Sequence, residues 1–172
     1  RLRGWLVPGE GSGPRRSAIV MLHGYPFDKS NVLPLAGFLR REHDVLLFDF
    51  RGLGESEGRM TTIGYREVRD LRSAVDYLRA CGYERIGVWG FSLGGAVALL
   101  GLAQGGRVEA VVADSPYADL GRLTAGYYAA LGPLRWPLAL LTRLWARLIV
   151  GVDPSAVSPA RAVRGVEMPI LL

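Results

Sequence analysis

Residues 85–100 read RIGVWGFSLGGAVALL, and this stretch decides the fold. Residues 86–89 form an apolar run of strand length, whereas residues 96–102 are rich in Ala and Leu, which favour a helix. Between them, residues 90–94 match Gly-x-Ser-x-Gly, in the strand-to-helix context that this motif requires. The pattern predicts a sharp strand-turn-helix corner with Ser92 at its tip.

The chemistry of such a corner explains its glycines. A cramped backbone there typically costs about 1–3 kcal/mol, and glycines two residues before and after the corner remove side chains that would collide. The helix that follows points its first amides at the same place, so the N–H of Leu93 could stabilise a developing oxyanion. We interpret Ser92 as a nucleophile; the alternative is an ordinary glycine-rich turn, which the flanking elements disfavour.

Composition indicates one globular domain. The 172 residues are 49% hydrophobic and 22% charged, which excludes a disordered chain. The net charge is +5, but the arginines are spread without a block of like charge, so we expect no nucleic-acid partner. Cys81 is the sole cysteine and forms no internal disulfide, and no signal peptide or spanning segment is visible. We expect a cytoplasmic protein whose upstream residues are missing, since the chain opens with Arg1.

Strand and helix patterns alternate along the chain. Helices are predicted over residues 31–41, with Ser30 or Asn31 as the cap, and over residues 61–80, with Arg66–Asp70 and Arg72–Asp76 at ion-pair spacing. Residues 9–16 have the composition of a loop. The predicted strands, the first of them an edge strand, cover residues 2–7, 17–22, 45–50, 86–89, 108–113 and 168–172.

This alternation predicts a parallel sheet with helices on both faces, whose ligand site lies beyond the carboxyl ends of the strands. Polar residues follow several of these ends, so we expect them along one rim of the sheet: His23, Asp49, Arg51, Ser92 and Asp114.

Three motifs together carry a resemblance to a known family. They are His23-Gly24, the DFRGLGES segment at residues 49–56, and the GFSLGG segment at residues 90–95. In this order and at these intervals they resemble the α/β-hydrolase family, most of all its bacterial branch of serine esterases and peptidase-like enzymes. The resemblance implies a mostly parallel doubly wound sheet with a small helical cap. Residues 1–172 would form one domain truncated at both ends, with the cap at about residues 120–165.

The resemblance also implies roles for single residues. Ser92 matches the nucleophile, and the backbone N–H groups of Leu93 and Tyr25 match the oxyanion hole. His23 and Gly24 match the turn that shapes this loop, so His23 is not the catalytic base. Arg51 is interpreted as an anchor of neighbouring loops. The expected partner is a small-molecule acyl substrate, and acyl transfer of this kind needs no metal or organic cofactor.

One departure from the family is serious. The expected order is nucleophile, acid, histidine, yet the two histidines, His23 and His43, both precede Ser92. His43 is interpreted as a surface residue away from the corner. The family's acid usually follows the strand that residues 168–172 begin, so we expect a fragment. Asp114 is the alternative acid, or else a carboxylate that braces its own loop.

These observations lead to two hypotheses about function. The favoured one is a serine hydrolase that cleaves an ester, thioester or amide through an acyl-enzyme, with these 172 residues alone nearly inactive. The alternative is a non-catalytic binding module on the same fold, or an inactive fragment. The chain beyond Leu172 separates the two, because a downstream acid and histidine would support the enzyme.

Residues 136–150 have helical spacing of apolar side chains. Leu138, Leu141, Trp145 and Leu148 fall on one side, and Arg143 and Arg147 on another. We favour a lid helix that packs these apolar residues on the core. The alternative is a helix that contacts a membrane surface, since basic amphipathic stretches with Trp do so.

Overall fold

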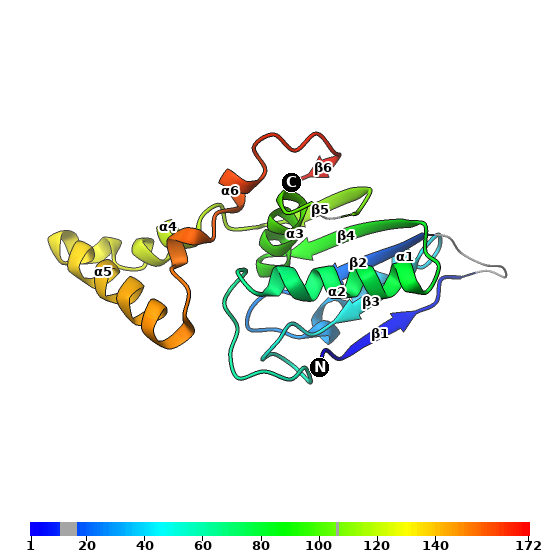
Figure 1. The fold of residues 1–172 in the computed structure, drawn as a ribbon, viewed down its shortest axis with the longest axis horizontal. Helices are drawn as coiled ribbons and strands as arrows, with labels where there is room; N and C mark the ends of the chain where they lie inside the picture. Colours follow the sequence, from blue (N-terminus) through cyan, green and yellow to red (C-terminus); the bar gives the residue numbers. More distant parts are fainter. Residues whose placement is uncertain (11–16, 106) are drawn as a thin grey trace.

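A six-stranded sheet runs through the centre of the protein (Figure 1). The computed structural model describes residues 1–10, 17–105 and 107–172. The strand order is β1-β3-β2-β4-β5-β6, with β1 antiparallel to β3 and all other pairs parallel. The strands are β1 (Gly4–Val7), β2 (Ser17–Leu22), β3 (Asp44–Phe48), β4 (Arg85–Phe91), β5 (Ala110–Asp114) and β6 (Ile170–Leu171). The predicted edge strand and the mostly parallel sheet are confirmed.

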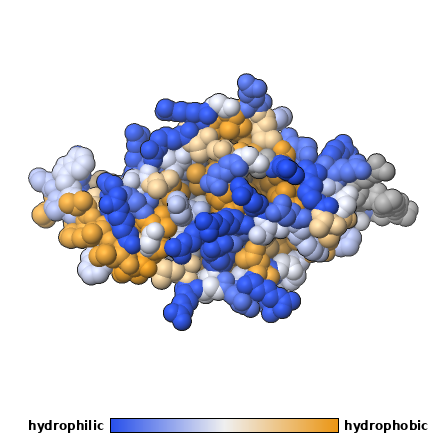
Figure 2. Space-filling model, in the orientation of Figure 1, coloured by the Kyte–Doolittle hydropathy of each residue, from blue (hydrophilic) through white to orange (hydrophobic). Residues whose placement is uncertain are grey.

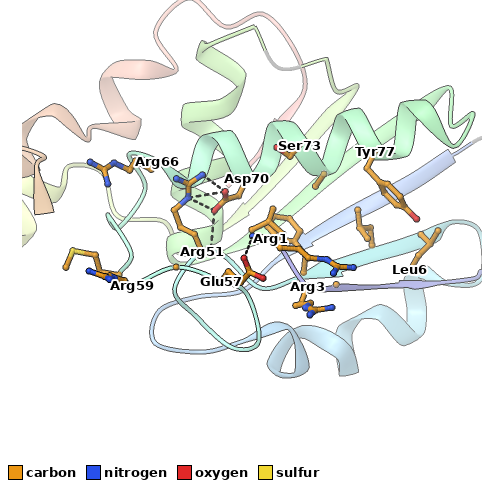
Figure 3. Close-up of a pocket in the computed structure, with 17 residues that line it drawn as sticks. Arg1, Arg3, Leu6, Arg51, Glu57, Arg59, Arg66, Asp70, Ser73 and Tyr77 are labelled. Carbon is orange, nitrogen blue, oxygen red and sulfur yellow. Dashed lines mark hydrogen bonds and ion pairs between the residues drawn. The ribbon is translucent and has the colours of Figure 1, made fainter.

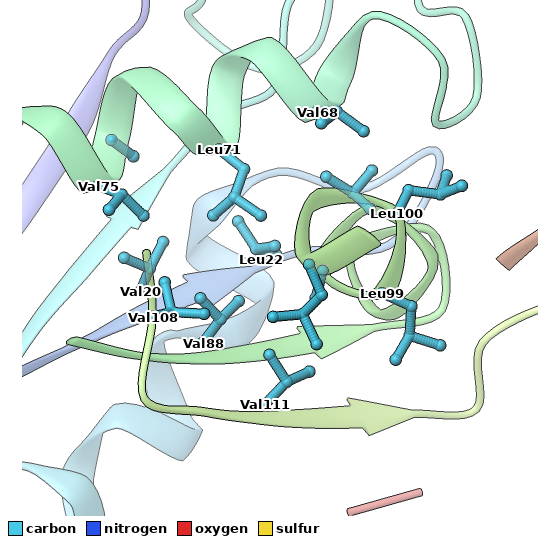
Figure 4. Packing of buried hydrophobic residues seen from close by; sticks show 14 of the residues in the cluster. Val20, Leu22, Val68, Leu71, Val75, Val88, Leu99, Leu100, Val108 and Val111 are labelled. Carbon is cyan, nitrogen blue, oxygen red and sulfur yellow. The ribbon is translucent and has the colours of Figure 1, made fainter. Parts of the chain in front are cut away.

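Helices cover both faces of this sheet. In β2, Val20 and Leu22 face the larger core under α2 (Glu67–Ala80) and α3 (Leu93–Ala103), as Figure 4 shows. Met21 points the other way, into a smaller core under α1 (Leu33–Leu39). Alternate residues of a strand point to opposite faces, so a strand buried on both faces is apolar throughout. The doubly wound arrangement is therefore confirmed.

The helix predicted over residues 61–80 begins only at Glu67. Ile63 and Gly64 have φ of 48° and 112°, which a helix cannot contain. The buried carboxylate of Glu67 accepts hydrogen bonds from Thr62 N (2.7 Å) and Gly64 N (2.9 Å), and from the hydroxyls of Thr61 and Thr62. Burial alone would raise the pKa of Glu67, but these bonds outweigh it and hold the pKa below its usual value.

The ion pair predicted between Arg66 and Asp70 is wrong. Asp70 is buried on α2 and instead binds Arg51, whose Nη2 lies 2.6 Å from Oδ1 of Asp70. The Asp70 carboxylate also accepts the backbone N–H of Arg51. Arg51 therefore anchors the loop after β3 to α2, in agreement with the sequence interpretation.

Three smaller expectations need correction or qualification. The turn before α1 is a 3-10 helix, η1 (Lys29–Val32), capped by Asp28 and not by Ser30 or Asn31. His43 is half-buried, and its Nδ1 lies 2.9 Å from Oγ of Ser17, within hydrogen-bond distance. It is therefore not a plain surface residue. Of the loop expected at residues 9–16, residues 11–16 lie outside the described part of the chain.

After β5 the chain forms a helical arm, which we define as residues 120–150. It projects beyond the carboxyl-terminal edge of the sheet (Figure 1). Its elements are α4 (Leu120–Gly126), η2 (Ala129–Leu134), α5 (Arg135–Trp145) and η3 (Ala146–Val150); η4 (Pro154–Ala156) and α6 (Pro159–Ala162) follow. Within the described residues, no helix is both long and apolar enough to cross a membrane.

The expected packing of the 136–150 helix on the core is wrong. Helix α5 contacts mainly α4, η2 and η3, and it presents its Leu138, Ala139 and Thr142 side inward. Leu141, Trp145 and Leu148, which were predicted to face the core, are exposed. Both tryptophans of α5 and its leucines other than Leu138 are exposed, so most of its large apolar residues point outward.

The buried Glu67 generates a stability prediction. Glu67→Gln should lower the free energy of unfolding by about 2 kcal/mol at pH 7, because it removes hydrogen bonds to a charged acceptor and turns an NH₂ group toward donors. The pKa of Glu67 is depressed in the folded state, so its stabilisation is present at neutral pH and lost as the pH falls through that folded value. Urea denaturation should therefore show the difference from wild type shrinking in acid.

The exposed Glu42 provides the matched control. Glu42→Gln should change the free energy of unfolding by less than about 0.5 kcal/mol. Equal losses in both variants, or a Glu67→Gln loss that persists unchanged in acid, would contradict this account of the turn.

Candidate active site

Ser92 stands at the corner between β4 and α3. Its φ of 51° and ψ of −108° lie outside the regions that L residues normally occupy. The N–H of Ser92 donates to the carbonyl oxygen of Asp114 (2.8 Å), which ties the corner to the end of β5. The side chain is half-buried, and its hydroxyl forms no hydrogen bond within the described residues. The hydroxyl is therefore free to meet a ligand.

Glycines make this corner sterically feasible. A Cβ at Gly90 would overlap the backbone of Gly94, and a Cβ at Gly94 would overlap the carbonyl oxygen of Leu22 on the neighbouring strand. A Cβ at Gly95 would lie 3.0 Å from the carbonyl oxygen of Gly90. The glycines that the motif places around Ser92 are thus required by close backbone approach.

The turn after β2 runs beside Ser92. Leu22 pairs with Gly90 in the sheet, so the residues that follow each strand emerge side by side. A Cβ at Gly24 would lie 3.3 Å from Cβ of Ser92. Within the described residues, the N–H groups of Leu93 and Tyr25 have no hydrogen-bond acceptor. Two unpaired amides therefore flank the Ser92 hydroxyl, one from α3 and one from this turn.

His23 is buried in the same turn, but both of its nitrogens are occupied. Nε2 accepts the N–H of Phe50 (3.1 Å), so Nδ1 carries the proton and donates to the carbonyl oxygen of Gly24 (2.8 Å). Burial lowers the pKa of His23, which keeps the ring neutral. These bonds hold the turn in place and leave neither nitrogen for Ser92.

His43 lies at the opposite edge of the sheet. It precedes β3, and its partner Ser17 begins β2, so both are at the amino ends of the parallel strands. Ser92 follows the carboxyl end of β4. Neither histidine of the chain is thus in a position to take the Ser92 proton.

Asp114 ends β5 next to the corner. Its carboxylate accepts a hydrogen bond from the hydroxyl of Ser115 (2.9 Å), and Ser115 has a φ of 50°. The backbone carbonyl of Asp114 accepts the N–H of Ser92, and the side chain of Asp114 is half-buried. This geometry favours the loop-bracing interpretation, while the alternative of a catalytic acid stays a prediction.

Asp49 is at the predicted rim but belongs to a buried structural network. Its carboxylate accepts hydrogen bonds from Lys29 Nζ (2.7 Å), Lys29 N (2.7 Å) and Glu55 N (2.8 Å). Lys29 also lies 4.6 Å above the ring of Trp5. Sequence reasoning missed this buried cation, and the signal was its status as the single lysine in an arginine-rich chain.

A cavity of about 830 Å³ lies between β1 and α2, away from the corner (Figure 3). The Arg51–Asp70 pair forms part of its wall, and Ser92 does not line it. This cavity is separate from the candidate site.

A mostly parallel sheet with helices on both faces and a serine at a strand-turn-helix corner are features of the α/β-hydrolase fold. A family model described as "alpha/beta hydrolase fold" matches residues 17–141. The chain therefore belongs to the α/β-hydrolase family.

Relatives and solved structures agree with this assignment. The chain is 38% identical to the thiohydrolase aneE of Aspergillus aculeatus over 123 residues, which is 67% of this chain and 38% of that protein. It is 36% identical to the polyketide transferase ATR5 of Stachybotrys chlorohalonatus, over 69% of this chain and 41% of that protein. The structure of the Pyrococcus furiosus esterase Pf2001 superposes with a TM-score of 0.72 at 30% identity, covering 98% of this chain and 63% of that one. The chain thus spans less than half the length of these two relatives.

The glycine contacts at the corner generate a second stability prediction. Gly94→Ala should lower the free energy of unfolding by about 3 kcal/mol, because the added methyl group meets the backbone of β2. Gly37→Ala is the matched control, since Gly37 lies in α1 with nothing within 4 Å of its Cβ position. That change should be neutral or stabilising by up to about 1 kcal/mol. Thermal or urea denaturation distinguishes the two, and an unaffected Gly94→Ala variant would show that the corner is looser than described.

Proposed function

We propose that the chain supplies the nucleophile and the oxyanion hole of a serine hydrolase that cleaves an ester, thioester or amide. The observation that carries the proposal is the strained, unpaired Ser92 hydroxyl flanked by the free N–H groups of Leu93 and Tyr25. Backbone strain is often found where a side chain must be held for chemistry.

The proposed reaction has two stages. Ser92 Oγ attacks the acyl carbon while its proton passes to a base, and the two amides bind the oxygen that becomes negative. The bond to the leaving group then breaks, and the leaving group takes that proton. Water attacks the acyl-enzyme in the second stage, gives a proton through the base back to Ser92, and releases the acid.

The names of the similar proteins support this class of substrate. One relative is a thiohydrolase and one structural neighbour is an esterase. Ester hydrolysis takes place at an acyl carbon, which is where a nucleophile beside an oxyanion hole would attack. Residues 120–165, proposed as a cap within a single domain, would supply the pocket walls.

The proposal predicts where a fluorophosphonate reacts. In the complete gene product the probe should label one serine, Ser92, as found by peptide mapping, because only an activated hydroxyl attacks such a reagent. Ser92→Ala should abolish labelling. Ser115→Ala is the matched control, since Ser115 also has a positive φ and stands at the neighbouring strand end, and this variant should label normally.

Labelling at another residue, or none in the complete gene product, would refute the nucleophile. Such a result would favour the alternative of a non-catalytic binding module.

A further prediction concerns the 172 residues alone. We expect them to hydrolyse an activated aryl ester on the order of a millionfold more slowly than a complete site, the loss seen when a serine protease lacks its base. The reason is that both histidines are engaged away from Ser92. A steady-state assay with the Ser92→Ala variant as control measures this. Sustained turnover that Ser92→Ala abolishes would mean that another group acts as the base.

A further inference from the structure

The outward side of α5 and η3 is a continuous apolar stripe. Trp136, Leu140, Leu144 and Leu148 recur every four residues, so they lie in line along one side of the helix. Leu141 and Trp145 lie beside them, and all six side chains are between 48% and 68% exposed. Figure 2 shows hydrophobic surface gathered at the end of the molecule where Figure 1 has α5.

A basic groove adjoins this stripe. It has a volume of about 670 Å³ between α4, α5 and α6, and Trp136 and Leu140 belong both to its wall and to the stripe. Four arginines also line it: Arg122, Arg143, Arg161 and Arg164.

The groove's arginines differ in their partners. Arg143 pairs with Asp153 (3.0 Å) and Arg161 with Asp119 (3.7 Å). The guanidinium groups of Arg122 and Arg164 form no hydrogen bond or ion pair with any described residue. Two cationic groups are therefore available to an external anion.

Charge is concentrated in this part of the chain. Residues 120–165 contain six arginines and one acidic residue, Asp153, so their net charge of +5 equals that of the whole protein. Residues 1–119 are nearly balanced, with 15 basic and 14 acidic residues. An apolar surface bordered by uncompensated arginines matches an anionic lipid surface, where each basic residue adds to the binding.

We propose that the stripe and the basic groove dock the protein on an anionic phospholipid bilayer. Helix α5 would lie parallel to the bilayer, with its leucines and tryptophans between the headgroups and with Arg122 and Arg164 against lipid phosphates. Because the arm lies beyond the carboxyl-terminal edge of the sheet (Figure 1), docking brings the Ser92 edge toward the lipid.

A second copy of the chain fits this surface less well. In a dimer, residues 120–165 of the two copies would bring their net charges of +5 together, and like charges across an interface oppose association. An anionic bilayer supplies the opposite charge to the same arginines. The charge distribution therefore selects the lipid surface over self-association.

The test is vesicle co-sedimentation of the complete gene product. We expect it to bind phosphatidylcholine vesicles containing 30% phosphatidylglycerol at least tenfold more tightly than pure phosphatidylcholine, with binding weakened by 500 mM NaCl. Leu144→Glu/Leu148→Glu should reduce binding at least tenfold. The matched control is Leu33→Glu/Leu35→Glu on α1, two exposed leucines outside the arm, which should bind as wild type does.

A second pair of variants isolates the charge. Arg122→Gln/Arg164→Gln should weaken binding to the anionic vesicles by about fivefold for each arginine and leave the weak binding to neutral vesicles unchanged. Arg59→Gln/Arg69→Gln, two exposed arginines outside residues 120–165, should have a smaller effect.

Three outcomes would overturn the proposal. The first is no vesicle binding by a folded, monodisperse protein. The second is an equal loss in the α1 control. The third is a dimer in light scattering that Leu144→Glu/Leu148→Glu dissociates while vesicle binding is unchanged, which would assign the stripe to a second copy. All are independent of whether Ser92 reacts.

Discussion

The close approach of β2, β4 and α3 at Gly90 and Gly94 is the constraint on which the rest of the structure depends. Every residue from Leu93 to Leu102 is buried, so α3 forms the centre of the larger core and must begin directly at the end of β4. The strained conformation of Ser92 costs about 1–3 kcal/mol. Burying a single large apolar side chain contributes about 1.5–3 kcal/mol, and α3 buries several, so core packing outweighs the strain at the corner.

The fold could be predicted from the sequence because the patterns that determine it lie within short segments of the chain. The glycine spacing around Ser92 indicates a close backbone contact, and the apolar run of β2 indicates a strand that is buried on both faces. The start of α2 was predicted wrongly because the positive φ of Ile63 cannot be inferred from the amino-acid composition of this segment. The Lys29–Asp49 pair was missed because it joins residues 20 positions apart, and periodicity within one element does not detect such a pair.

The helical arm shows a different limit of sequence reasoning. Helical periodicity indicates that α5 has an apolar side, but it does not say what that side contacts, and Leu141 and Trp145 proved to face outward. The even spread of arginines also concealed a charge asymmetry, because the acidic residues, and not the basic ones, are unevenly distributed. For the candidate site, the motif predicted the corner at Ser92 and Leu93 and the family resemblance pointed to Tyr25, whereas the engagement of both ring nitrogens of His23 required coordinates.

The geometry at Ser92 does not depend on a neighbouring base. The conformation of Ser92 is set by backbone contacts alone: the glycines on either side, the carbonyl oxygen of Asp114 and the first turn of α3. In the described part of the chain, no hydrogen bond from a histidine contributes to it. Preorganised amides act on charge without rearranging, and the loss of one typically costs about a hundred- to a thousandfold in rate. A corner built this way keeps its geometry whether or not a base is present. The geometry of the proposed oxyanion hole is therefore set by the fold, whereas the proposed reaction also requires a base, which neither His23 nor His43 is placed to supply.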